Sequence, residues 1–323
     1  MNSKHSILDI PFNQLLSRDR MAIMGCAMLA IMLFHQAFFR GNLLVDAFHL
    51  CGFWGVDMFL LISGFGLAHS LRKHSITTYY RNRFVRLLPS CVLVGSAKLA
   101  LSHLGFTELT NGNVLLQVTS LYMWYIFAIV IYYLLAPFIH RALNRFGIWV
   151  FVGACAIAFV CTFVPYENFH IYMVCFFFKW VPDRLPVFVL GMYIAMHPLR
   201  LSNKQLLVGG SILFVVCLIL RVAHIRTHLN LTLLALAVPA MCIAGSYVKT
   251  ALDRVRCGRV LEFLGKYSLE IYLWHGFIFA NMHKNAMFAG IPAALNMALA
   301  VTVSLTLAYV THWLAGKIGQ LVK

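Results

Sequence analysis

Long apolar stretches dominate this sequence and constrain what it can fold into. About ten of them have roughly the 20 residues that a helix needs to cross the hydrocarbon core of a bilayer. They lie near residues 21–39, 50–71, 87–104, 114–139, 148–164, 171–197, 205–222, 229–248, 260–281 and 291–316. In lipid the backbone polar groups must be satisfied within each segment, so such stretches are expected to be helical. The sequence therefore predicts an all-α polytopic membrane protein with about ten transmembrane helices.

The composition agrees with a membrane protein and argues against a nucleic-acid partner. Hydrophobic residues make up 61% of the chain and charged residues 11%, whereas soluble proteins have roughly 45–50% and about 25%. The net charge of +16 is carried mainly by short segments between apolar stretches, where orientation bias explains it. If the N-terminus is cytoplasmic, most Lys and Arg residues fall on the cytoplasmic side. This bias predicts that both termini are cytoplasmic.

The chain shows no internal repeat, no Gly/Ser-rich linker and no long polar stretch. We therefore expect a cytoplasmic N-terminal segment, residues 1–20, followed by a single transmembrane domain, residues 21–323. One apolar stretch is interrupted by the polar and proline residues Lys179, Pro182, Asp183, Arg184 and Pro186. This interruption predicts a short re-entrant piece followed by a span.

Two ionisable residues lie inside the first two apolar stretches. His35 is near the end of the first, and Asp57 is about two turns into the second. Ionisable groups in hydrocarbon are costly and usually face a protein interior or a wet cavity. Because consecutive spans tend to pack as neighbours, the two residues are predicted to share one cavity, where a carboxylate would make the imidazole a stronger base. The alternatives are a histidine bonded to a backbone carbonyl and an aspartate in a helix–helix hydrogen bond.

A basic segment, residues 72–86, is predicted to form a cytoplasmic loop after the second span. Its cations are Arg72, Lys73, Arg81, Arg83 and Arg86. Guanidinium groups bind phosphates bidentately, so the loop could hold a phosphorylated ligand from the cytosol. The alternative is an orientation signal that contacts anionic lipid headgroups.

The ninth apolar stretch contains an unusual number of polar groups. Ser268, Tyr272 and His275 share one helix face, and Glu270 lies between them. Such a run predicts a face that lines a polar cavity. The alternative is aromatic anchoring near the membrane interface together with an intrahelical pair between Lys266 and Glu270.

Six segments, in order along the chain, resemble the signatures of the membrane acyltransferase 3 family. Members of this family move acyl groups from a cytoplasmic thioester onto carbohydrate hydroxyls. The resemblance runs from about residue 18 to residue 315, and the segments are Ala27–His35, Gly55–Phe65, Tyr80–Pro89, Trp124–Pro137, Arg184–Met192 and Leu264–His275. The chain looks like the stand-alone form, without an appended esterase-like domain.

The resemblance implies roles for individual residues. His35 would be the general base on the acceptor hydroxyl, and Asp57 would orient its ring. Donor-binding residues would be Arg83 and Arg86, which hold the phosphates, with Arg20 and Arg81 as further contacts. Substrate-binding residues would be Trp124, Arg184, Ser268, Glu270, Tyr272 and His275. The donor would be acetyl-CoA or another acyl-CoA, and no metal is implied.

The sequence departs from the family pattern at two places. The family usually carries a basic residue at the position of Met24, and Arg20, one turn earlier on about the same face, can stand in for it. The family also often has an acidic residue shortly after the tryptophan of the fourth span, whereas residues 125–132 contain none.

We therefore expect a membrane-bound O-acyltransferase of the bacterial cytoplasmic membrane, in contact with membrane lipid. It would transfer an acetyl or similar group from a cytoplasmic acyl-CoA to a hydroxyl of a cell-envelope carbohydrate or glycolipid. Direct transfer and a two-step route through an acyl-histidine remain alternatives. A proton-coupled transporter or lipid flippase would show similar spans and intramembrane charges, but its usual sign is an internal repeat, which we do not find.

Overall fold

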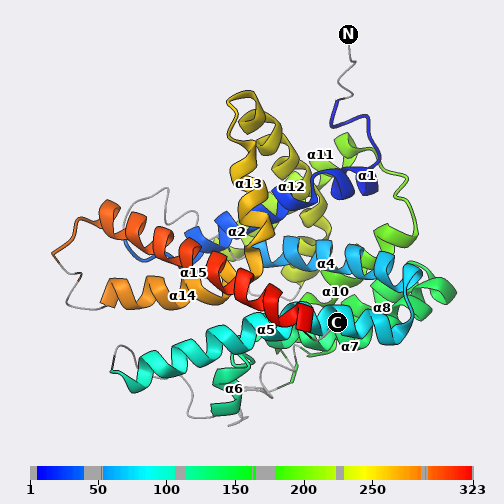
Figure 1. Cartoon of the computed structure of the whole chain (residues 1–323). Helices are drawn as coiled ribbons and strands as arrows, with labels where there is room; N and C mark the ends of the chain where they lie inside the picture. Colours follow the sequence, from blue (N-terminus) through cyan, green and yellow to red (C-terminus); the bar gives the residue numbers. More distant parts are fainter. Residues whose placement is uncertain are drawn as a thin grey trace.

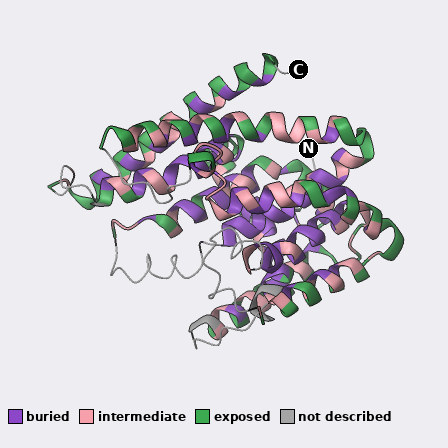
Figure 2. Ribbon diagram, turned by 90° about the horizontal axis from the view of Figure 1, so that it is seen from below, coloured by how far each residue is buried: buried purple, intermediate pink, exposed green. Residues whose placement is uncertain are grey.

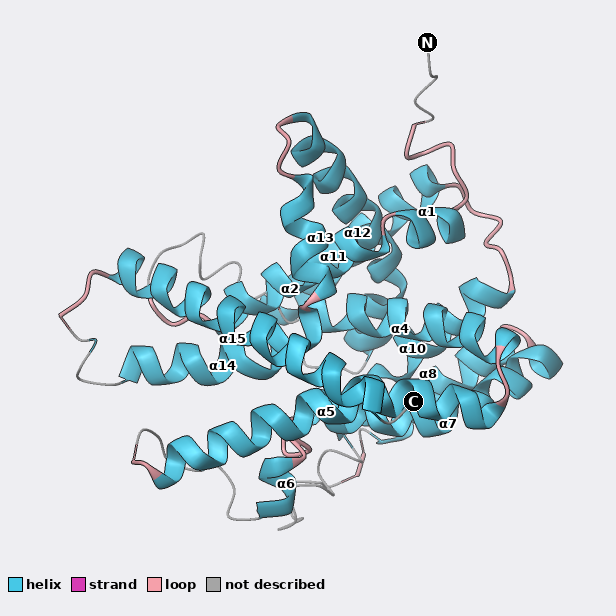
Figure 3. Ribbon diagram, in the orientation of Figure 1, coloured by secondary structure: helices cyan, strands magenta, loops and turns pink. Residues whose placement is uncertain are grey.

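The chain folds into a bundle of helices, shown in Figure 3 for the computed structural model. The structure describes residues 6–39, 52, 54–105, 114–161, 163–164, 179–222, 229–284, 288 and 290–321, and it contains no β-strand within these ranges. The helices (Figure 1) are α1 (Phe12–Arg18), α2 (Arg20–His35), α4 (Trp54–Lys73), α5 (Ile76–His103), α6 (Val114–Val118), α7 (Trp124–Phe146), α8 (Trp149–Cys161), α10 (Val181–Met196), α11 (Asn203–Val222), α12 (Leu229–Arg254), α13 (Gly258–Lys266), α14 (Ser268–Lys284) and α15 (Ala293–Leu321). The predicted all-α class is confirmed for the described residues.

Among the described residues, 6 helices are long and apolar enough to cross a membrane, namely α4, α5, α7, α11, α12 and α15. The helices α2 and α8 are shorter but also apolar. The two remaining predicted stretches overlap α10 and the pair α13–α14. The protein is therefore an integral multi-pass membrane protein. The count of ten spans and the cytoplasmic location of the termini stay predictions.

The basic segment that was predicted to be a loop is helical. α4 continues to Lys73, and Ser75 caps α5 by accepting a hydrogen bond from the backbone N–H of Thr78 on its Oγ at 3.3 Å. A serine N-cap satisfies one of the donors that a helix start leaves open, so α5 begins almost at once. The loop prediction was wrong because charge was taken as a sign of a loop, although arginine and lysine favour helix. The arginines of this segment are thereby fixed on a helix.

The interruption predicted in the sixth apolar stretch is the start of a helix. Pro182 lies in the first turn of α10, where the N–H that proline lacks would have no partner within the helix. Asp183 is also in this first turn, where the helix dipole favours an acidic group. Arg184 and Pro186 follow without a break in the helix. Residues 171–178, where the re-entrant piece was predicted, lie outside the described residues.

The helix α4 is the most enclosed of the candidate spans, with 78% of its most apolar window buried. It packs against α2, α7, α10 and α12. Gly64 of α4 faces the carbonyl oxygen of Phe188, and Gly191 of α10 faces that of Leu61, so closely that a Cβ at either glycine would collide with backbone. Small residues allow such close approach of helices in membranes, where packing drives association. Buried residues accordingly gather in the middle of the bundle, and exposed ones on its outer helices (Figure 2).

A second close contact joins α2 to α13. Gly25 faces the carbonyl oxygen of Leu261, and Gly265 faces that of Met21, again with no room for a Cβ. The ninth predicted stretch is not one helix, because α13 and α14 meet at Tyr267, which belongs to neither. The break lets α13 pack along the first part of α2, while α14 also contacts α2.

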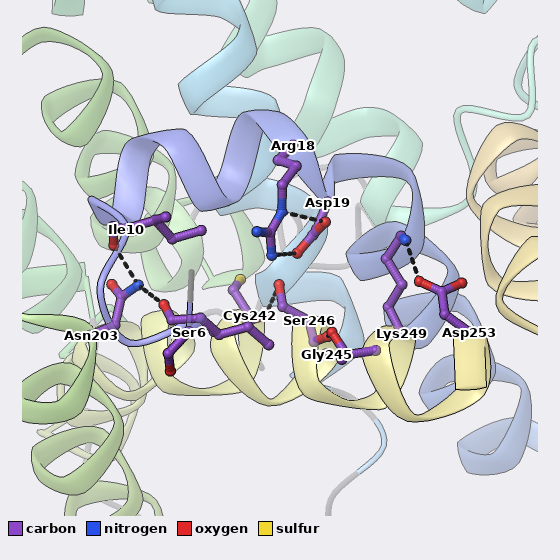
Figure 4. Close-up of polar contacts among 12 residues, drawn as sticks. Ser6, Ile10, Arg18, Asp19, Asn203, Cys242, Gly245, Ser246, Lys249 and Asp253 are labelled. Carbon is purple, nitrogen blue, oxygen red and sulfur yellow. Dashed lines mark hydrogen bonds and ion pairs between the residues drawn. The ribbon is translucent and has the colours of Figure 1, made fainter. Parts of the chain in front are cut away.

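The segment before α2 is anchored to the bundle. Leu15 is fully buried, and the Nδ2 of Asn203 donates hydrogen bonds to the carbonyl oxygens of Ile7 at 2.7 Å and Ile10 at 2.8 Å (Figure 4). These contacts tie the N-terminal segment to the start of α11. They fix the beginning of α2, and with it the position of Arg20.

Candidate active site

One pocket is lined by residues of five helices, and we call it the arginine pocket. Its cavity volume is about 80 Å³, below the roughly 300–1,000 Å³ of most ligand pockets, so a molecule of coenzyme size would enter it only in part. The lining residues, from α2, α4, α5, α7 and α14 in turn, are Arg20, Met24, Phe59, Ser63, Leu67, Arg83, Arg86, Leu87, Tyr125, Ile129, Tyr133, Ser268, Leu269 and Tyr272.

The positive charge of the arginine pocket comes from Arg20, Arg83 and Arg86. Among the described residues, no carboxylate forms an ion pair with any of the three. The Nε atoms of Arg20 and Arg83 are buried without a hydrogen-bond partner in the described part of the chain, although Arg83 lies over the ring of Tyr79 at 6.0 Å. As whole residues, Arg20 and Arg83 are half-buried and Arg86 is exposed. The pocket therefore holds guanidinium donors that suit a bound anion such as phosphate.

The geometry of α5 and α2 explains which arginines reach the pocket. Arg83 and Arg86 are three residues apart, so they are neighbours on one face of α5. Arg81 is exposed and does not line the pocket. On α2 both Arg20 and Met24 line the pocket. Arg20 thus lies in the same pocket as Met24, the position where the family usually has a basic residue.

Two histidines form a pair outside the arginine pocket. His35 is exposed at the end of α2, and His275 is buried on α14. The Nε2 of His275 lies 3.2 Å from the Nδ1 of His35. Each Nδ1 also lies near a carbonyl oxygen one turn earlier in its own helix, Ile31 at 2.9 Å for His35 and Ile271 at 3.0 Å for His275. The backbone contact of His35 was foreseen as an alternative, whereas its contact with a second imidazole was not.

Tyr272 connects the arginine pocket to the histidine pair. It lines the pocket, and its ring centroid is 4.9 Å from that of Tyr125 and 5.6 Å from that of His275. Both α2 and α14 run from the pocket toward the pair, and they contact each other. Along α2, Arg20 and His35 are separated by roughly 22 Å. The histidine pair therefore lies at the far end of α2 and near the middle of α14, one turn beyond Tyr272.

Asp57 and Arg184 bind each other. The Nη1 of Arg184 lies 3.0 Å from Oδ1 and 2.9 Å from Oδ2 of Asp57, and the side chains are only 6% and 3% exposed. In the described part of the chain, the hydrogen bonds of Asp57 all go to this guanidinium. The structure thus places Asp57 in an ion pair between α4 and α10, and not against the ring of His35. A helix–helix contact was the alternative for this residue.

The polar residues of α14 face two directions. Ser268 and Tyr272 line the arginine pocket. Glu270 is buried, and its Oε1 accepts a hydrogen bond from the Oγ of Ser90 at 2.8 Å and lies 3.2 Å from the Nδ1 of His312. The structure shows these contacts instead of an intrahelical pair with the lysine of α13. Ser268 and Tyr272 thus line a cavity, as predicted for this run, whereas Glu270 is buried in contacts with α5 and α15.

Lys98 is a buried cation to which the sequence analysis gave no role. Its Nζ donates hydrogen bonds to the carbonyl oxygen of Leu273 at 2.6 Å and to the hydroxyl of Tyr122 at 3.2 Å. Its position within an apolar stretch could have marked it as a candidate, because ionisable residues in membrane spans usually have a function. The contacts join α5 to α14 within one turn of His275.

Trp124 lies at the start of α7, beside the pocket but not in its lining. Its ring stacks on that of Trp180, with centroids 5.2 Å apart and planes at 28°. Its neighbour Tyr125 does line the pocket. The two tryptophans thus form an aromatic surface next to the end of the pocket where Tyr125 and Tyr272 meet.

Comparison with known proteins gives one family match. A family model described as an acyltransferase domain matches residues 23–313, which is nearly the whole chain. No curated protein and no solved structure matches the sequence. The matched region begins in α2 and ends in α15. It includes His35, His275 and every lining residue of the arginine pocket except Arg20.

Proposed function

Because this chain belongs to the acyltransferase 3 family, we propose that it transfers an acetyl or similar acyl group from a cytoplasmic acyl-CoA to a hydroxyl of a cell-envelope carbohydrate or glycolipid. Membership of this family, together with the apolar helices, identifies the protein as a membrane acyltransferase. The acyl-CoA donor, the carbohydrate acceptor and the bacterial cytoplasmic membrane are our proposal.

The arginine pocket is the observation that carries the choice of donor. Three guanidinium groups that have no carboxylate partner among the described residues can bind an anion, and the phosphates of coenzyme A supply several negative charges. Guanidinium groups bind phosphate through paired hydrogen bonds. Ser268 and Tyr272 line the same pocket, so we assign them to the donor as well. The thioester end of the bound acyl-CoA would then extend past Tyr272 toward His35.

In this proposal the histidine pair, at the end of α2 and one turn beyond Tyr272 on α14, supplies the chemistry. His35 is exposed, so an acceptor hydroxyl can approach it. As a general base His35 would take the hydroxyl proton while the oxygen attacks the thioester carbonyl. The tryptophan pair beside Tyr125 would offer an aromatic contact to the acceptor, which is the role we assign to Trp124.

The function is tested by following a label from donor to acceptor. Purified protein in lipid nanodiscs is incubated with radiolabelled acetyl-CoA and with membrane glycolipid fractions. We expect label in the glycolipid. Replacing His35 by alanine should lower transfer by about 10²- to 10⁴-fold, the usual contribution of a general base, while acetyl-CoA binding by calorimetry is retained.

The matched control is His103→Ala, which removes an exposed histidine at the end of α5 and should leave transfer unchanged. Full transfer activity in His35→Ala would remove His35 from the chemistry. A wild-type protein that binds acetyl-CoA but labels no lipid or glycan fraction would contradict the proposed acceptor class.

A further inference from the structure

The two imidazoles of the histidine pair meet through specific ring nitrogens. The Nε2 of His275 faces the Nδ1 of His35 at 3.2 Å, and the ring planes stand at 73° to each other. Both Nδ1 atoms also face a carbonyl oxygen of their own helix. A neutral imidazole has one N–H donor and one lone pair, so these contacts determine where the protons sit.

The proton of His275 is fixed by its own helix. Its Nδ1 lies 3.0 Å from the carbonyl oxygen of Ile271, and a carbonyl oxygen can only accept. The Nδ1 must therefore carry the hydrogen and donate it. In the neutral ring this leaves the lone pair on Nε2, which is the atom that faces His35.

The proton of His35 is fixed both by its own helix and by His275. Its Nδ1 is 2.9 Å from the carbonyl oxygen of Ile31 and 3.2 Å from the Nε2 of His275, and both of these atoms are acceptors. A hydrogen on Nδ1 satisfies both contacts. The opposite assignment would point lone pairs at carbonyl oxygens in both helices, which is unfavourable, most of all at the buried His275.

We propose that His275 is a positioning residue that, together with the carbonyl oxygen of Ile31, holds His35 in the Nδ1–H form, so that Nε2 of His35 is the atom that accepts the proton of the acceptor hydroxyl. This inference rests on the proposed function of His35. Orientation of a catalytic imidazole is commonly the task of a carboxylate that binds the opposite ring nitrogen. Here the carboxylate that sequence suggested, Asp57, is bound to Arg184, and a second imidazole contacts His35 instead.

The transfer step balances with these atoms. The hydroxyl proton passes to Nε2 of His35 as the oxygen forms a bond to the thioester carbonyl carbon. The carbon–sulfur bond then breaks, and the proton on Nε2 goes to the departing sulfur, which leaves as the thiol of coenzyme A. In the charged intermediate, the Nδ1–H of His35 remains a donor to the Nε2 of His275, so the pair supports the charge.

Nitrogen NMR of ¹⁵N-histidine-labelled protein in nanodiscs tests the tautomer directly, with the His35 signals identified by their loss in His35→Ala. We expect a protonated Nδ1 and an unprotonated Nε2 in the wild type. In His275→Phe, which keeps a ring but has no acceptor, only the carbonyl oxygen of Ile31 still accepts from Nδ1–H. We therefore expect a measurably weaker preference of His35 for this form and a fall in kcat of roughly 100-fold, with the donor KM unchanged. In His275→Gln the amide oxygen can accept from Nδ1–H, so the tautomer and most of kcat should return.

The outcomes separate this inference from the proposed function. A wild-type His35 protonated at Nε2, or a tautomer that His275→Phe leaves unchanged, would overturn the positioning role. Wild-type kcat in His275→Phe would also overturn it, even if His35 is essential for transfer. If the tautomer is as proposed and responds to His275 but no acyl group is transferred, the proposed function fails and the assignment of the pair stands.

Discussion

Replacing Arg83 by glutamine should weaken acyl-CoA binding. The guanidinium lines the arginine pocket, has a buried Nε and has no carboxylate partner among the described residues. A hydrogen bond to a charged group contributes about 1.5–3 kcal/mol, which corresponds to a loss of affinity of roughly 10- to 150-fold. Because Arg86 is exposed, solvent screens its contribution, and Arg86→Gln should fall near the lower end of that range.

Titration calorimetry of acetyl-CoA against the purified variants measures this effect. Arg81→Gln is the matched control, because Arg81 lies on the same helix and carries the same charge but is exposed and outside the pocket. We expect it to bind acetyl-CoA as the wild type does. With acetyl-pantetheine, which lacks the nucleotide phosphates, the difference between Arg83→Gln and wild type should disappear.

Equal affinity of Arg83→Gln and Arg81→Gln for acetyl-CoA would refute this reasoning. The basic face of α5 would then be explained by contact with anionic lipid headgroups and by membrane orientation. An effect of Arg83→Gln that persists with acetyl-pantetheine would mean that the residue stabilises the fold of the pocket and does not bind phosphate.

Two further predictions concern the packing that holds the site. Asp57→Asn removes the carboxylate that pairs with the buried guanidinium of Arg184 and should destabilise the protein by about 3–5 kcal/mol. In thermal unfolding, the double variant Asp57→Asn/Arg184→Met should be more stable than Asp57→Asn alone. Strictly additive effects of the two substitutions would argue against the ion pair. Gly191→Ala introduces a Cβ against the backbone of α4 and should lower the melting temperature. The control Gly153→Ala, with nothing within 4 Å of the new Cβ, should leave the melting temperature unchanged or raise it. Similar melting temperatures of the two variants would show that α4 and α10 are less tightly packed than described.

The features that depend on composition and local spacing could be predicted from the sequence. The all-α membrane class followed from the length of the apolar stretches and is confirmed. The family resemblance, which depended on six short segments in order, is confirmed by the match to residues 23–313. The resemblance grouped Arg20, Arg83 and Arg86 as donor-binding residues, and the structure brings all three to one pocket, although the segment of Arg83 and Arg86 was predicted to be a loop.

The features that depend on contacts between distant segments could not be predicted. His35 and His275 are far apart in sequence, and only the packing of α14 against α2 brings their rings together. The position of Asp57 two turns into its span was consistent with a contact to His35. Nothing local indicated that α10 would place Arg184 beside it, because side-chain direction in a bundle is set by which helices pack together.

The break between α13 and α14 is another feature that could not be predicted from the sequence. The apolar stretch has no proline near Tyr267, and its polar neighbours Lys266 and Ser268 are compatible with a continuous helix, so the local sequence gave no clear sign of an interruption. The close contact of Gly25 and Gly265 with opposing backbone shows how tightly α13 lies on α2. That packing is a property of the bundle and is not visible in the local sequence.

We expect the arginine pocket to bind an acyl-CoA so that its thioester points toward the histidine pair. The most direct measurement is an experimental structure with a non-hydrolysable thioether analogue of acetyl-CoA. We expect phosphate oxygens about 2.7–2.9 Å from the guanidinium nitrogens of Arg20, Arg83 or Arg86, with the acyl end beyond Tyr272 toward His35. An analogue bound elsewhere, or bound in the pocket with its acyl end directed away from the histidines, would contradict the account.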